Sequence, residues 1–119
     1  MKISNKIYWV FLFVVLIALN KVEAHSALTA SSPENGAVLN EAPTTLELKF
    51  KGQVKLVKVI LSGDNIDESK LSVEPDKGFD NNFTLTLPSL TSGKYTISWM
   101  VMGADTHKIT GEISFNVKL

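Results

Sequence analysis

From about residue 45 onward, apolar and polar positions alternate along the chain with a period of two. The alternation is clearest over residues 46–50, 57–61, 83–87, 95–101 and 113–119. This pattern is typical of a β-strand with one face in a core, because successive side chains of a strand point to opposite faces. The pattern therefore predicts strands in these segments. Their apolar positions, Val57 and Leu119 among them, are predicted to face a core.

Clusters of turn-forming residues separate the alternating segments. They lie at residues 32–36, 62–65, 75–78 and 91–93, and no stretch carries a convincing helical stripe. A first strand is expected at about residues 27–31. About seven short strands joined by turns predict an all-β fold, an immunoglobulin-like Greek-key β-sandwich. A small open barrel is the alternative.

The beginning of the chain differs from the rest and has the features of a secretory signal peptide. Two lysines, Lys2 and Lys6, precede an apolar run of 13 residues, residues 7–19, which is shorter than the roughly 20 residues that span a membrane. Val22 and Ala24 then occupy the −3 and −1 positions of a cleavage site. We expect residues 1–24 to be removed on export, leaving one domain of residues 25–119. A retained anchor is the alternative.

The charge of this predicted domain excludes several classes of partner. Removing the three lysines and one glutamate of the signal leaves nine basic and eleven acidic side chains, and no arginine. A net charge near −2 gives no electrostatic reason to bind nucleic acid or an anionic membrane. The chain has no cysteine. Any metal site must therefore use histidine, carboxylate, methionine or backbone groups.

Both histidines of the predicted domain can be assigned to one metal site. Cleavage at the expected position makes His25 the first residue, and a free amino-terminal histidine chelates a metal through its α-amine and its ring Nδ1. The other histidine, His107, follows Asp105 in a loop between a strand ending near Met102 and one beginning near Gly111. If this loop is extended, the side chains of Asp105 and His107 point the same way.

The resulting ligand set favours copper. Three nitrogens and a carboxylate oxygen suit tetragonal Cu(II), whereas Zn(II) prefers a tetrahedron. Neither half of the set is specific alone, because D-x-H triplets are common and a lone loop histidine is usually solvated. Together they indicate one Cu(II) site at His25, Asp105 and His107. A metal-free interaction module with incidental histidines stays open as an alternative.

The chain resembles the CopC family of periplasmic copper-binding proteins. The resemblance is carried by residues 25–33 (HSALTASSP), 46–50 (LELKF) and above all 93–117 (GKYTISWMVMGADTHKITGEISFNV). Its most specific part is G-x-Y-x-I-x-W followed by D-T-H-x-x-x-G-x-x-x-F. The resemblance implies a cupredoxin-like, immunoglobulin-type sandwich and Cu(II) ligation by His25, Asp105 and His107. It also implies a periplasmic location, with a membrane copper importer or another copper-handling protein as a candidate partner.

Two departures from the family narrow the expected function. Some members have a second histidine where this chain has Ala27, and some carry a methionine-rich Cu(I) loop, whereas residues 63–82 contain no methionine. Met100 and Met102 are expected on the opposite face of their strand from the core. We therefore expect a soluble, monomeric periplasmic protein that carries, buffers or sequesters Cu(II) and is not an enzyme. A histidine-brace copper oxidase-type enzyme is the alternative within copper chemistry.

Overall fold

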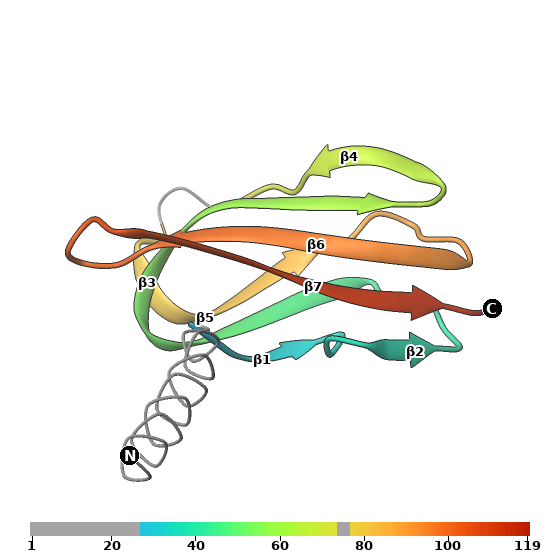
Figure 1. Ribbon diagram of the computed structural model, residues 1–119, viewed down its shortest axis with the longest axis horizontal. Coiled ribbons are helices and arrows are strands. Elements are labelled where there is room, and N and C mark those ends of the chain that lie inside the picture. Colours follow the sequence, from blue (N-terminus) through green and yellow to red (C-terminus); the bar gives the residue numbers. More distant parts are fainter. Residues whose placement is uncertain (1–26, 74–76) are drawn as a thin grey trace, which may run out of the picture.

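The computed structural model describes residues 27–73 and 77–119, and this part of the chain forms seven β-strands (Figure 1). In chain order they are β1 (Leu28–Ser32), β2 (Ala37–Leu39), β3 (Thr45–Gly63), β4 (Ile66–Lys70), β5 (Phe79–Thr86), β6 (Gly93–Met102) and β7 (Lys108–Val117). The predicted all-β fold and its number of strands are confirmed. Nothing in the described part of the chain is a helix long and apolar enough to cross a membrane. The predicted signal peptide and His25 lie outside the described residues.

Strand β3 joins the two layers of the sandwich because it runs through both of them. Its first half pairs with β1 and β5, and its second half pairs with β4 and β6. Between the halves, β3 curves round at one end of the molecule and turns back (Figure 1). The segments predicted as two strands, residues 46–50 and 57–61, are therefore two halves of one strand. Strand β7 pairs along β6, and β2 joins β7 in parallel.

The apolar alternation of β3 changes parity partway along the strand. The buried positions up to Leu56 are all even-numbered, whereas Val59 and Leu61 are the buried positions after it. The change occurs at a β-bulge between Leu56 and Lys58, where one extra residue reverses the direction of every side chain that follows. Val57 therefore points outward and is 38% exposed, so its prediction as a core residue was wrong.

The prediction that the last strand extends to Leu119, with Leu119 in the core, was also wrong. Leu119 shares the parity of the buried positions of β7, but the strand ends at Val117. The side chain of Leu119 is 69% exposed, because the chain has left the sheet before it is reached.

Tyr95 fixes one end of the sandwich. It is 1% exposed and stacks on Phe115 of β7 with ring centroids 5.6 Å apart, and its Oη donates a 2.7 Å hydrogen bond to the carbonyl of Thr91. A buried tyrosine at the start of a strand, bonded to the backbone a few residues upstream, is the tyrosine corner of immunoglobulin-like Greek-key sandwiches. This contact supports the predicted topology.

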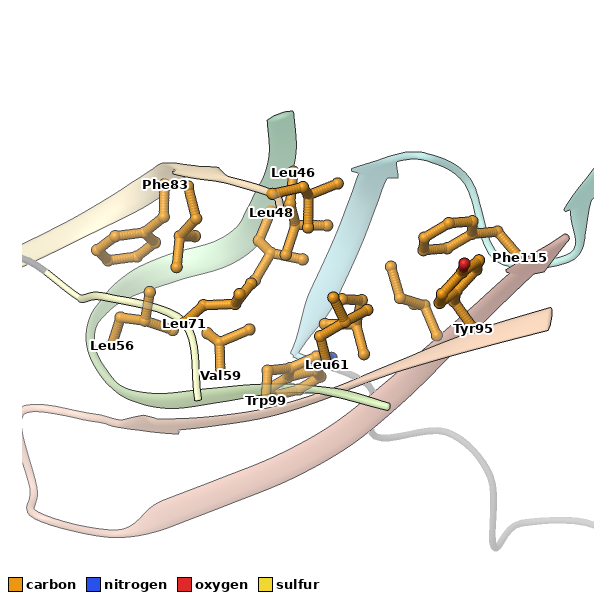
Figure 2. Close-up of a cluster of buried hydrophobic side chains, with 14 of the residues drawn as sticks. Leu46, Leu48, Leu56, Val59, Leu61, Leu71, Phe83, Tyr95, Trp99 and Phe115 are labelled. Atoms are coloured by element: carbon orange, nitrogen blue, oxygen red, sulfur yellow. The ribbon is translucent and has the colours of Figure 1, made fainter. Parts of the chain in front are cut away.

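Trp99 fills the middle of the core between the layers (Figure 2). Phe50 of β3 meets its ring edge-on, with centroids 5.1 Å apart. On the neighbouring strand β7, the indole lies directly over Gly111. A Cβ atom at Gly111 would overlap the ring, with even Cε2 only 2.8 Å away. A larger residue at position 111 would therefore have to displace Trp99.

We expect Gly111→Ala to lower the free energy of unfolding by about 1–3 kcal/mol, the usual cost of overpacking a core. Urea denaturation followed by circular dichroism would measure it. Gly52→Ala is the matched control, because no atom lies within 4 Å of its Cβ position, and its effect should stay within about 0.5 kcal/mol. Equal effects of the two substitutions would contradict the tight approach of Trp99.

Candidate metal centre

The loop between β6 and β7 contains the two described residues of the predicted site, Asp105 and His107. It lies at the opposite end of the sandwich from the C-terminus (Figure 1). Strand β7 begins at Lys108, three residues earlier than the sequence suggested, so His107 is the last residue of the loop. Two backbone hydrogen bonds of 3.0 Å close the loop, from the Gly103 N–H to the His107 carbonyl and from the Thr106 N–H to the Gly103 carbonyl.

The loop is a tight turn, and not the extended segment that the sequence prediction assumed. Thr106 has a φ of +68°, a left-handed conformation that is unusual for a β-branched residue. The reversal at Thr106 brings the flanking side chains together, with His107 Nδ1 2.8 Å from Asp105 Oδ2. The backbone N–H of His107 also donates to Asp105 Oδ1 at 3.2 Å. The two residues thus meet as predicted, but through a turn and not through strand alternation.

Both side chains are open to solvent. The exposed fraction is 84% for the side chain of His107 and 69% for that of Asp105. The side-chain hydrogen bond from His107, followed by the backbone one, lowers the pKa of the Asp105 carboxyl below its ordinary value. Asp105 is therefore held as an anion. Because the pair is exposed, its contribution to the stability of the fold is small, and its ligand atoms remain accessible.

Asp105 and His107 do not form a complete metal site by themselves. Within residues 27–73 and 77–119, no group of three histidine, cysteine, aspartate or glutamate side chains is placed to hold a metal. The third predicted ligand, His25, lies outside these ranges. The described part of the chain therefore supplies two adjacent donors on an exposed turn, and further donors must come from elsewhere.

Trp99 carries a polar group that the sequence prediction overlooked when it placed this residue in the core. Its Nε1 is the one buried side-chain nitrogen or oxygen in the described part of the chain without a hydrogen-bond partner. Leaving such a group unpaired costs about 1–3 kcal/mol. The period-two pattern finds buried positions, but it carries no information on whether a buried N–H is satisfied.

Known proteins match this chain over nearly all of its described residues. The CopC domain family model matches residues 28–118. Copper resistance protein C of Pseudomonas syringae pv. tomato is 29% identical over 124 residues, which cover 96% of this chain and 98% of that protein. Copper transport protein CutJ of Bacillus subtilis (strain 168) is 29% identical over 119 residues, which cover 92% of this chain but only 21% of CutJ. This chain therefore spans about one fifth of CutJ.

The fold is shared with a solved structure. The crystal structure of CopC from Methylosinus trichosporium OB3b superposes with a TM-score of 0.65 at 24% sequence identity. The match covers 79% of this chain and 94% of that one. At this identity the likeness shows a common sandwich fold.

We expect His107→Ala to raise the pKa of the Asp105 carboxyl toward its ordinary value. The substitution removes the side-chain hydrogen bond, which is the main cause of the lowered pKa. A carbon-13 NMR titration of the metal-free protein would measure this change. The sign follows from the lowered pKa: any stabilisation by the pair is present at neutral pH and is lost as pH falls through that pKa. Lys108→Ala is the control and should leave the titration of Asp105 unchanged. An unchanged titration in His107→Ala would contradict the described contact.

Proposed function

The chain belongs to the CopC family, and from this premise we propose that it is an exported protein that binds copper and carries, buffers or sequesters it. Copper resistance and copper transport are the functions named for the two curated relatives. The observation that carries the proposal for this chain is the Asp105–His107 pair, preformed on an exposed turn at one end of the domain. Two adjacent donors open to solvent suit the reversible binding of an ion.

The proposed site holds one Cu(II) ion between His25, Asp105 and His107. Removal of residues 1–24 would free the α-amine of His25, which then supplies two nitrogens. Asp105 already carries its negative charge, and its Oδ2 lies 2.8 Å from His107 Nδ1. Both side chains are exposed, so they are free to turn from this hydrogen bond toward one ion.

The direction of β1 supports the inclusion of His25. Leu28 pairs with Phe50, whose ring contacts Trp99 in β6. Strand β1 begins and strand β6 ends toward the end of the sandwich that carries the β6–β7 loop (Figure 1). Three residues span at most about 10 Å, which is also the length of β6 from Trp99 to its end. An extended His25 would therefore reach the level of the loop.

The proposed coordination favours a carrier over an oxidase. With two nitrogens from His25 and one from His107, the carboxylate of Asp105 would complete a tetragonal set that suits Cu(II). No equatorial position would then stay open for oxygen. The amine must lose its proton to bind, and its ordinary pKa is about 7.7–8.0. Copper affinity should therefore fall as the pH is lowered.

We expect one extra residue ahead of His25 to weaken Cu(II) binding by at least about tenfold, because His25 then has no free α-amine to chelate the metal. The protein would be exported with its signal, its start at His25 confirmed by intact mass, and copper titrated by electron paramagnetic resonance. An extra residue after Leu119, which is 69% exposed, is the matched control and should change nothing. Equal affinity in all three proteins would sink the proposed site.

We expect Asp105→Asn to weaken Cu(II) binding while leaving the fold intact, because it removes the charge but keeps the size of an exposed side chain. Trp99 provides the readout, since it is the only tryptophan after residue 24. Its fluorescence should be quenched at higher copper concentrations than in the unsubstituted protein. Asp64→Asn, at the other end of the sandwich, is the control. Identical titrations for both substitutions would argue against Asp105 as a ligand.

A further inference from the structure

A groove opens on the outer surface of the sandwich next to the β6–β7 loop. It encloses about 570 Å³, and Val57, Met102 and Val73 contribute apolar surface to its lining. Val57 is present there because the bulge in β3 turns it away from the core. Bulges often re-aim a side chain beside a functional site. The apolar surface that Val57 adds to the groove is therefore a direct consequence of the parity change in β3.

Three lysines from three different strands line this groove. They are Lys55 of β3, Lys70 of β4 and Lys108 of β7. Lys55 and Lys108 pair with Met102 from opposite sides. The side chains of Lys55, Lys108 and Met102 therefore project from the same face of the sheet. We call the surface formed by Lys55, Lys70, Lys108, Val57 and Met102 the lysine groove.

The positive charge of the lysine groove is not neutralised within the described part of the chain. None of its lysines forms an ion pair there, and no described carboxylate lines the groove. Asp80 is paired with Lys77 at 3.7 Å, and Asp105 is engaged with His107. Lysines that lie together repel one another, and an anion placed between them relieves this repulsion. The predicted domain has a net charge near −2, so this concentration of lysines points to an anionic occupant.

Further apolar surface lies beside the lysine groove. Phe79, which pairs with Lys55, is 47% exposed. A concave slot with apolar lining and a few charged groups fits a peptide segment. A flat lipid surface would not fill it. The groove thus matches an acidic segment that carries apolar residues.

We propose that the lysine groove docks an acidic segment of a partner protein. Carboxylates of the partner would meet the lysines, and an apolar side chain would cover Val57 and Met102. Because Met102 and Lys108 are the residues on either side of the β6–β7 loop, a docked partner lies directly against Asp105 and His107. The role of this docking in copper transfer rests on the proposed function, whereas the docking itself requires no metal.

The test uses a short synthetic peptide of glutamate and leucine, titrated into the metal-free protein and followed by NMR. We expect amide shifts at Val57, Met102 and Lys108, and an affinity that falls with added salt. The double substitution Lys55→Glu with Lys108→Glu should weaken binding by at least about tenfold. The matched control, Lys94→Glu with Lys118→Glu, makes the same change of net charge at the other end of the sandwich and should weaken it less than about threefold.

Three outcomes would overturn the docking proposal: equal weakening in the two double variants, equal binding of a glutamine–leucine peptide, or binding to phosphatidylglycerol vesicles without any peptide binding. The last outcome would identify a lipid-binding surface. Copper titration of the unsubstituted protein separates this proposal from the metal site. If copper binds but the peptide does not, only the docking proposal fails. If the peptide binds but copper does not, the groove stands and the proposed cargo is wrong.

Discussion

The structure depends on the continuity of one strand through both layers of the sandwich. Strands β1, β4, β5 and β6 all hydrogen-bond to β3, and the chain has no cysteine to link the layers covalently. The layers are therefore held together by β3 itself and by the apolar core between them. A strand that turns from one layer into the other must keep its apolar side inward throughout. The bulge at Val57 is where β3 makes this adjustment.

The path of β3 also decides which segments meet at the loop end of the molecule. Strand β6 runs antiparallel to the second half of β3 and finishes where β3 turns back, and β1 starts at the same end because it runs antiparallel to the first half (Figure 1). The proposed ligands come from the segment before β1 and the loop after β6. Their convergence would be a result of topology, although about 80 residues separate them in the sequence.

Much of this arrangement could be predicted from the sequence, and the failures have physical causes. Alternation predicted β3 (as two separate strands), β5, β6, β7 and most of the core, because burial on one face imposes a period of two. It did not predict the short strands β2 and β4. It misplaced Val57 because Leu56 and Val57 are both apolar, and the pattern does not reveal which one a bulge turns outward. The left-handed conformation of Thr106 was equally invisible, since threonine is not a residue that favours positive φ. The lysine groove depends on strand register, which brings together lysines that lie far apart in the sequence.

A protein that hands over a metal benefits when its stability does not depend on the ligands. Here stability comes from a core in which Trp99, Phe50 and their neighbours are almost fully buried. Asp105 and His107 stand outside that core on a turn whose shape is set by backbone hydrogen bonds. The left-handed turn at Thr106 is held between the paired ends of β6 and β7. The proposed ligands are exposed and can therefore be reached by a partner, whereas a buried site would have to open before it could release its ion.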